Sequence, residues 1–153
     1  MRKFWSAYSL LITVLLIAGC ANHPKEELVK RAVQQTEKYF SLLKGDNVDA
    51  ALSLFDSKFF GVTSEKKLRE VLLDIRNRIG TIKEVELLKT VQTTEESMGI
   101  ESGNVIVSYK VTYSNGYAAS EEFEFDTTDR VFEQIDRWSF KAYVEDSSAV
   151  KQQ

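Results

Sequence analysis

Along residues 24–80, apolar residues recur every three or four positions, which is the spacing of helices that bury one face. Short polar residues and glycines divide this region, because the former begin helices and the latter end them. The pattern predicts three helices, over residues 24–45, 46–55 and 63–80. Their expected terminal residues are Pro24, Gly45, Asp46 or Asn47, Thr63 or Ser64, and Gly80. Phe59-Phe60-Gly61 is expected to be a bulky apolar connector between the second and third helices.

From residue 81 onward, apolar and polar residues alternate, which is typical of strands with one buried face. The expected strands cover residues 85–91, 105–113, 117–126 and 138–144. Residues 95–103 are polar and predict a loop. Residues 127–137 leave two interpretations open, because Val131-Phe132 and Ile135 fit either a lengthened last strand or an irregular loop.

The turn between the two central strands determines which of their side chains share a face. A two-residue turn would pair Val107 with Glu124 and set the apolar residues of the strands on opposite faces. A three-residue loop over 114–116, with Gly116 in the left-handed conformation, pairs Val107 with Phe123. Both apolar faces then coincide, so we expect the three-residue loop.

The N-terminus has the pattern of a segment that directs export. Arg2 and Lys3 precede an apolar run over residues 10–19, and the first acidic residue is Glu26. A membrane-spanning helix needs roughly 20 apolar residues, and this run is too short. A basic start, a short apolar segment and small residues at its end indicate a secretory signal peptide over residues 1–19.

The end of this segment, Ile17-Ala18-Gly19-Cys20, resembles a lipobox, the sequence at which bacterial lipoproteins receive a diacylglycerol before cleavage. The resemblance implies that Cys20 carries a covalent lipid. The other interpretation is a buried core cysteine after an uncleaved apolar helix. Cys20 is the only cysteine, so no intramolecular disulfide can form. Ala21 follows it, and in a Gram-negative host the resemblance then implies the outer membrane, facing the periplasm.

The expected organisation is a signal peptide (1–19), a lipidated tether (20–25), one domain (26–146) and a flexible tail (147–153). Without residues 1–19 the chain has 134 residues, with 18 basic and 23 acidic side chains. The resulting formal charge of −5 makes nucleic acid a poor partner. We expect a monomer, because the sheet face away from the helices is polar at Asn104, Ser108, Lys110 and Thr112.

Helices followed by an antiparallel sheet form an α+β domain. The order of elements and four sequence segments resemble the nuclear-transport-factor-two-like fold, in which a curved sheet wraps round a helix to form a cone. The segments are LLKGDNVDAALSLF, VSYKVTYSNG, EEFEF and WSFKAYV. The resemblance covers residues 26–144 and is to a branch of small bacterial lipoproteins. It implies a ligand site at the mouth of the cone, but proteins of this fold differ widely in activity.

Glu121 breaks the apolar pattern of its strand, since it lies between Ala119 and Phe123 on the expected inward face, opposite Tyr109. A buried carboxylate needs a polar partner. Three interpretations are open. Tyr109 and Glu121 form a polar pair that binds or polarises a small ligand, or they form a structural hydrogen bond, or Glu121 lies at a solvent-exposed strand edge. Tyr39 and Tyr113 are further candidates for the pocket, or else aromatic residues of the core or rim.

Other chemistries find little support. The only histidine, His23, lies in the tether, so histidine-dependent catalysis within the domain is excluded. We expect no metal and no cofactor besides the lipid on Cys20. The first functional hypothesis is a non-catalytic module that binds an envelope protein or another envelope component. The second is a binding protein or enzyme that holds a small hydrophobic ligand with Tyr109 and Glu121.

Overall fold

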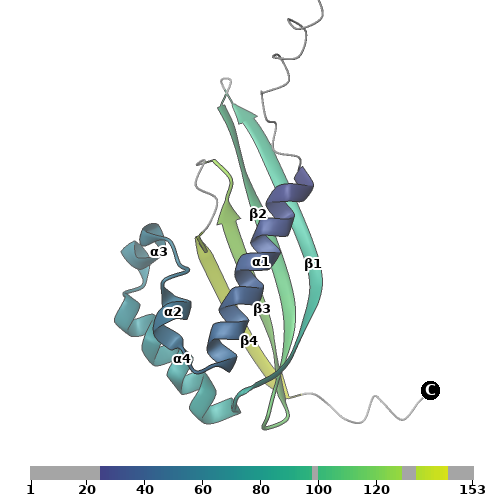
Figure 1. The fold of residues 1–153 in the computed structure, drawn as a ribbon. Coiled ribbons are helices and arrows are strands. Elements are labelled where there is room, and N and C mark those ends of the chain that lie inside the picture. The colour runs from purple at the N-terminus through teal and green to yellow at the C-terminus, as the bar shows by residue number, and fades with distance from the viewer. Residues whose placement is uncertain (1–24, 98–99, 129–133, 145–153) are drawn as a thin grey trace, which may run out of the picture.

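The computed structural model describes residues 25–97, 100–128 and 134–144. There, four helices precede one curved antiparallel sheet whose strands pair in chain order (Figure 1). The helices are α1 (Lys25–Lys44), α2 (Val48–Leu52), α3 (Ser57–Val62) and α4 (Glu65–Ile79). The strands are β1 (Ile82–Ser97), β2 (Ile100–Tyr113), β3 (Tyr117–Asp126) and β4 (Arg137–Val144). The α+β class and the four-stranded sheet are confirmed, while the number of helices differs by one.

The additional helix, α3, contains Phe59-Phe60-Gly61, so the prediction of a connector was wrong. Asp56 caps this helix, because its carboxylate accepts a hydrogen bond from the Lys58 backbone N–H at 2.6 Å. The rings of Phe59 and Phe60 pack against Phe55, with centroids 4.8 and 6.4 Å away. Cap and packing together compensate for the low helix propensity of Gly61.

The predicted polar loop over residues 95–103 was also wrong for residues 95–97 and 100–103, which are strand, while residues 98–99 lie outside the described residues. β1 and β2 pair from Ile82 opposite Tyr113 to Ser97 opposite Ile100, and form an arm that extends beyond α1 (Figure 1). Ladder hydrogen bonds join backbone groups, so polar side chains do not prevent pairing. Thr93 and Thr94 are β-branched and favour an extended chain.

The predicted register of the central hairpin is confirmed. Val107 pairs with Phe123, and Gly116 has a φ of 78°. The Gly116 N–H donates to the Tyr113 carbonyl at 3.1 Å and closes the loop. The inward side chains of β2 and β3 therefore share one face.

Ile135 answers part of the open question about residues 127–137. It lies outside β4 and forms a parallel bridge with Phe55. Its N–H donates to the Leu54 carbonyl at 2.8 Å, and its carbonyl accepts from the Asp56 N–H at 3.0 Å. The segment before β4 thus joins the sheet to the helices. Val131 and Phe132 lie outside the described residues, as do the predicted signal peptide over 1–19, Cys20 and the predicted tail over 147–153.

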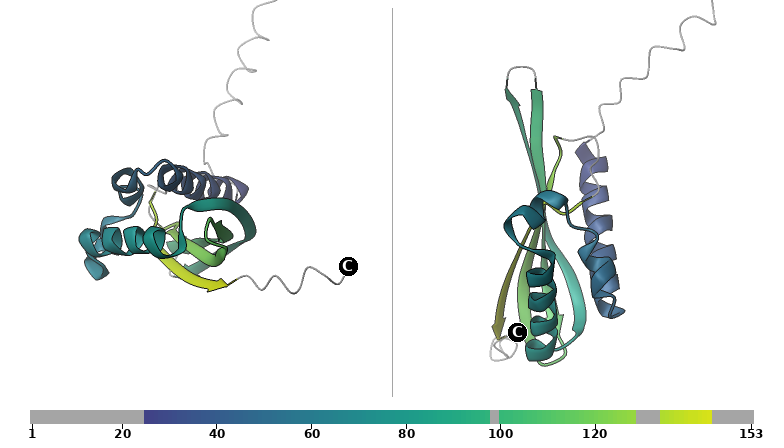
Figure 2. Two further views of the ribbon diagram at one scale, coloured as in Figure 1. Left: turned by 90° about the horizontal axis from the view of Figure 1, so that it is seen from below. Right: turned by 90° about the vertical axis from the view of Figure 1, so that its left-hand side faces the viewer.

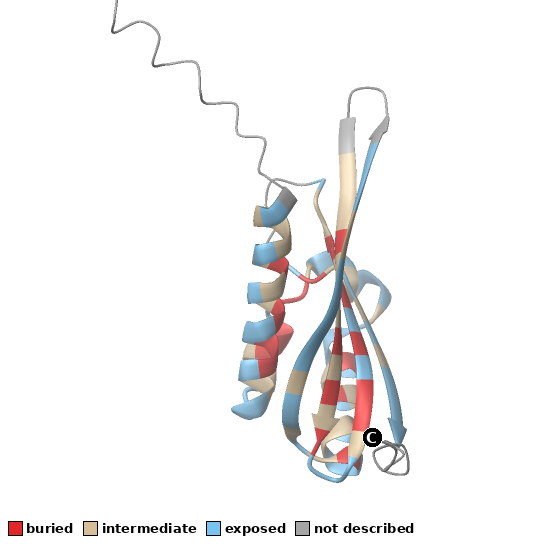
Figure 3. Ribbon diagram, turned by 90° about the vertical axis from the view of Figure 1, so that its right-hand side faces the viewer, coloured by how far each residue is buried: buried red, intermediate tan, exposed pale blue. Residues whose placement is uncertain are grey.

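The core lies where α1 faces the sheet. α1 packs against β1 and β2, and α2 connects it with α4 (Figure 2). The buried side of α1 faces buried residues of the central strands (Figure 3). Tyr39 and Phe40 of α1 contact Phe123 of β3 through edge-on ring pairs. Packing against the sheet thus holds the inner side of α1, including Tyr39, in a fixed position.

We expect Gly80→Ala to lower the free energy of unfolding by about 2 kcal/mol. Gly80 has φ 96° and ψ −170°, a conformation almost restricted to glycine, and an added Cβ would collide with the Ser114 hydroxyl. Urea unfolding measured by circular dichroism tests this. Gly61→Ala is the control, because it has open space in α3 and should cause no loss. Equal effects of the two substitutions would contradict the prediction.

Candidate functional site

Glu121 points into the molecule from β3, as the alternation of that strand predicts. Its side chain is almost fully buried, with 2% of the residue exposed, whereas the adjacent Ser120 and Glu122 are exposed. The period of two that buries Phe123 also buries this carboxyl group. The interpretation as a solvent-exposed strand edge was therefore wrong.

Glu121 accepts hydrogen bonds from residues other than Tyr109, the predicted partner. The Tyr113 hydroxyl donates to Oε1 at 2.8 Å, and the Trp138 indole N–H donates to Oε2 at 3.0 Å. Tyr109 is opposite Glu121 in the strand register, but its hydroxyl bonds to the Thr36 hydroxyl of α1 at 2.5 Å. The predicted hydrogen-bonded pair of Tyr109 and Glu121 was wrong, because the Tyr109 hydroxyl bonds to α1 and the Glu121 oxygens accept from other strands.

Burial controls the ionisation of the carboxyl group. Loss of solvation raises the pKa of Glu121 to about 7, although the hydrogen bonds from Tyr113 and Trp138 lower it in part. Burial also raises the pKa of Tyr113, and the charge of Glu121 raises it further. Near neutral pH, Glu121 therefore exchanges between charged and neutral forms while Tyr113 remains a hydrogen-bond donor.

Tyr39 is fully buried, yet its hydroxyl has no hydrogen-bond partner among the described residues. Burial raises the pKa of this phenol well above its ordinary value, and the negative charge of Glu121 contributes. Tyr39 therefore keeps its proton at neutral pH. A buried hydroxyl without any hydrogen-bond partner is unusual, because it forgoes hydrogen bonds that it would make in water.

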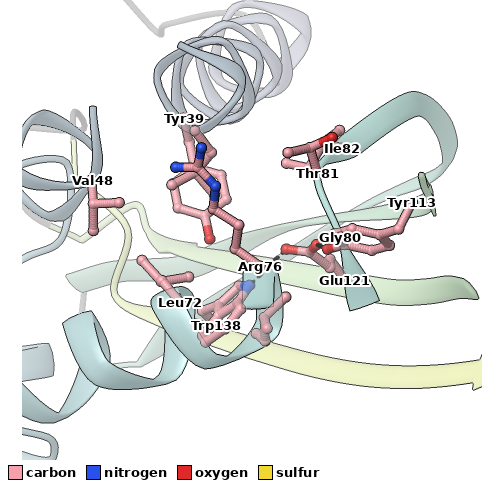
Figure 4. Close-up of a pocket in the computed structure, with 12 residues that line it drawn as sticks. Tyr39, Val48, Leu72, Arg76, Gly80, Thr81, Ile82, Tyr113, Glu121 and Trp138 are labelled. Carbon is pink, nitrogen blue, oxygen red and sulfur yellow. Dashed lines mark hydrogen bonds between the residues drawn. The ribbon is translucent and has the colours of Figure 1, made fainter. Parts of the chain in front are cut away.

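Tyr39 and Glu121 line the same small cavity between α1, α4 and the sheet (Figure 4). Its volume is about 40 Å³. One water molecule needs roughly 10–15 Å³ of such space, so the cavity suits a small polar group. The lining consists of Tyr39, Leu43, Val48, Leu72, Ile75, Arg76, Gly80, Thr81, Ile82, Tyr113, Glu121 and Trp138. The cavity thus combines an apolar wall with a few polar groups, as ligand sites do.

The fold unites three of the four predicted pocket residues, namely Tyr39, Tyr113 and Glu121. Tyr109 belongs to the core, where it bonds to Thr36. Sequence reasoning missed Trp138, which bonds to Glu121, and Arg76, which lines the same cavity. Their only local signal was an apolar pattern in β4 and a charged face on α4, and neither indicates which strand or helix lies nearby.

Arg76 lines the cavity from α4, and its guanidinium is paired with Asp46. The two side chains form an ion pair between the end of α1 and α4. Asp46 adopts a φ of 61°, the left-handed conformation in which the chain leaves α1. The ion pair is partly exposed, so solvent screens it.

A second, wider groove lies between α3, α4 and the β3–β4 side of the sheet. Its charged side chains include Lys58, Glu124 and Arg137, and Glu124 and Arg137 form an ion pair at 2.8 Å. Within the described residues, no three histidine, cysteine or acidic side chains are placed to hold a metal ion together. The groove offers a polar surface, whereas the small cavity contains the buried carboxyl group and the unpaired hydroxyl.

No protein-family model matches the chain, and no curated protein matches it significantly.

Proposed function

We propose that this protein is a lipid-anchored component of a bacterial envelope whose domain binds a small ligand without chemical conversion. The observation that supports binding is the Tyr39 hydroxyl, which is buried in the cavity wall without a partner. A ligand group placed between Tyr39 and Glu121 would satisfy this hydroxyl and use the free lone pairs of the carboxyl oxygens.

Binding accounts for these residues better than catalysis does. Both oxygens of Glu121 already accept hydrogen bonds, which orient the group. The tyrosines of the cavity remain protonated near neutral pH, and the only histidine is His23, in the tether. Catalysis by a pair of acid–base groups would need a second group that titrates near neutral pH, and besides Glu121 the cavity is lined by protonated tyrosines, one arginine and uncharged residues.

The resemblance to the nuclear-transport-factor-two-like fold supports the same site. Helices followed by a curved four-stranded sheet agree with that fold, and the cavity lies between them. In that fold the sheet forms a cone around the first helix and ligands enter at its mouth. We include the cone-shaped, ligand-binding arrangement in the proposal, together with a monomeric state.

Native mass spectrometry tests the binding function. The full chain is expressed in a bacterium, purified gently in mild detergent and measured next to Glu121→Gln. We expect an added small mass on the native protein that the variant lacks. Glu122→Gln, one residue along β3 and exposed, is the matched control and should retain the mass. A native protein without added mass, even after incubation with an envelope extract, would overturn the proposal.

The anchor is the second part of the proposal and rests on Ile17-Ala18-Gly19-Cys20 after a basic start and a short apolar run. No helix among the described residues has the length and hydropathy needed to cross a membrane. We propose a lipid on Cys20 that holds the domain close to the bilayer, at the outer membrane and facing the periplasm in a Gram-negative host.

Palmitate labelling tests this anchor. Cells that express the native chain should incorporate radiolabelled palmitate into it, and Cys20→Ser should abolish the label, because no other cysteine is present. The variant should also leave the membrane fraction. Label that persists in Cys20→Ser would contradict lipidation at this residue. Ser41→Ala, an exposed substitution, is the control and should keep the label.

A further inference from the structure

The chemical class of the ligand can be inferred from the hydrogen-bond partners of Glu121, because none of them is a cation. Its two hydrogen-bond donors, Tyr113 and Trp138, are both neutral, and it forms no salt bridge within the described residues. A carboxylate that is this deeply buried is costly unless a cation compensates its charge. When Glu121 is ionised, the cavity therefore presents an anionic group that no cation pairs with among the described residues.

The groups that line the cavity favour a ligand that donates hydrogen bonds, and a charged donor over a neutral one. An ionised carboxylate only accepts, so the ligand must donate to Glu121, and the Tyr39 oxygen can accept a second hydrogen bond. Three aromatic rings line the cavity: Tyr39 from α1, and Tyr113 and Trp138 from the sheet (Figure 4). Aromatic rings attract cations through their negative faces, which distinguishes a cation from a neutral alcohol or amide.

The charged groups near the cavity allow a cation to enter. Arg76 of α4 is the one cation among the lining residues, and its guanidinium is paired with Asp46. The other side chains that α1, α2 and α4 contribute are apolar, apart from Tyr39. A short hydrocarbon stem would contact Leu43, Leu72 and Ile82, while the charged end reaches Glu121.

From these contacts we infer that the cavity binds a small organic amine, whose primary ammonium group lies between Glu121 and Tyr39 and whose stem lies on the apolar wall. This inference rests on the proposed binding function and specifies its ligand class. It assigns Glu121 the role of counter-ion and Tyr39 the role of hydrogen-bond acceptor. Trp138 reports occupancy, because its indole N–H bonds to the same carboxylate.

Three probes with one stem test the charge: n-propylammonium, 1-propanol and propionate. Each is titrated into the full chain in detergent micelles while the Trp138 indole N–H signal is followed by NMR, with Trp138→Phe to assign it. We expect n-propylammonium to shift the signal and to bind at least tenfold more tightly than the other probes. Since the pKa of Glu121 is about 7, the ionised fraction of this group rises about tenfold from pH 6 to pH 8. The affinity for n-propylammonium should rise by the same factor.

Two variants separate the roles. Glu121→Gln should reduce n-propylammonium affinity at least tenfold and remove its pH dependence. Tyr39→Phe should reduce the affinity about fivefold without lowering the thermal midpoint, since the lost hydroxyl has no partner in the fold. A purely structural tyrosine would leave amine affinity unchanged.

The outcomes distinguish this inference from the function on which it rests. If 1-propanol or propionate binds as tightly as n-propylammonium and loses affinity in Glu121→Gln, the cavity binds ligands but the amine specificity is refuted. If n-propylammonium binds equally well to Glu121→Gln, the counter-ion role is refuted. If no probe binds and native mass spectrometry finds no added mass, both the amine inference and the binding function are overturned.

Discussion

Replacing Phe123 by alanine should lower the free energy of unfolding by about 4 kcal/mol, the largest effect that we expect from a single substitution. Phe123 is fully buried at the centre of β3. Its ring makes edge-on contacts with Tyr39, Phe40 and Tyr109, at centroid distances of 5.1, 5.5 and 6.1 Å. Alanine would remove these contacts and leave a cavity that the surrounding helix and strands cannot fully close.

Urea unfolding at constant pH measures this loss. Tyr143→Ala is the matched control: Tyr143 is an aromatic residue of the same sheet, but 42% of it is exposed. Its replacement should cost less than about 0.5 kcal/mol, as surface substitutions usually do. If Phe123→Ala costs less than about 1 kcal/mol, α1 does not pack on the sheet as described. Because α1 carries Tyr39, the loosened packing should also weaken ligand binding.

The second large effect is a dependence of stability on pH that comes from Glu121. Its pKa is about 7 in the folded protein and 4.5 when solvated. Between these values the folded state holds a proton that the unfolded state has released, so a rise in pH favours unfolding. The group's contribution is fully present below pH 4.5 and is lost as pH rises through 7. We expect a loss of about 2–3 kcal/mol between pH 5 and pH 8.

Glu121→Gln should remove this dependence. The amide resembles the protonated acid, since it can donate to the Tyr113 hydroxyl and accept from the Trp138 N–H. The variant should match the native protein near pH 5 and exceed its stability near pH 8. Urea unfolding over this pH range, with Glu122→Gln as an exposed control, measures the difference. Parallel curves for the native protein and Glu121→Gln would contradict the raised pKa.

The pH dependence of stability and the binding of an amine both depend on the charge of Glu121, so each can be used to test the other. A bound ammonium group would stabilise ionised Glu121 and thus lower its pKa in the complex. With n-propylammonium in excess, the native protein should therefore lose less stability between pH 5 and pH 8 than it loses alone. Glu121→Gln should show no such change.

Local patterns in the sequence determined the fold class and the orientation of residues in the central strands. Alternation placed Glu121 and Phe123 on the inward face, and the matching of apolar faces selected the three-residue loop that ends at Gly116. These features depend on the alternation along each strand and on the residues of one hairpin, so local periodicity and turn chemistry suffice. The lipobox resemblance around Cys20 belongs to the same local level and remains a prediction.

Tertiary structure alone determined which residues meet Glu121. Tyr113 and Trp138 reach it from different strands, and the predicted partner Tyr109 turns to Thr36 because α1 brings a hydroxyl within reach. Strand register places Cα atoms, but long side chains choose partners according to what packs above the sheet. The bridge of Ile135 to Phe55 likewise joins segments that are far apart in the chain.

Two local predictions failed for a related reason. Phe59-Phe60-Gly61 became helical because Asp56 caps α3 and Phe55 offers an aromatic surface. The polar arm of β1 and β2 became a paired ladder because its backbone bonds come from the opposite strand. In both places, and at the cavity between Tyr39 and Glu121, the outcome depends on contacts between segments, and the free energy of such contacts is absent from any local window of sequence.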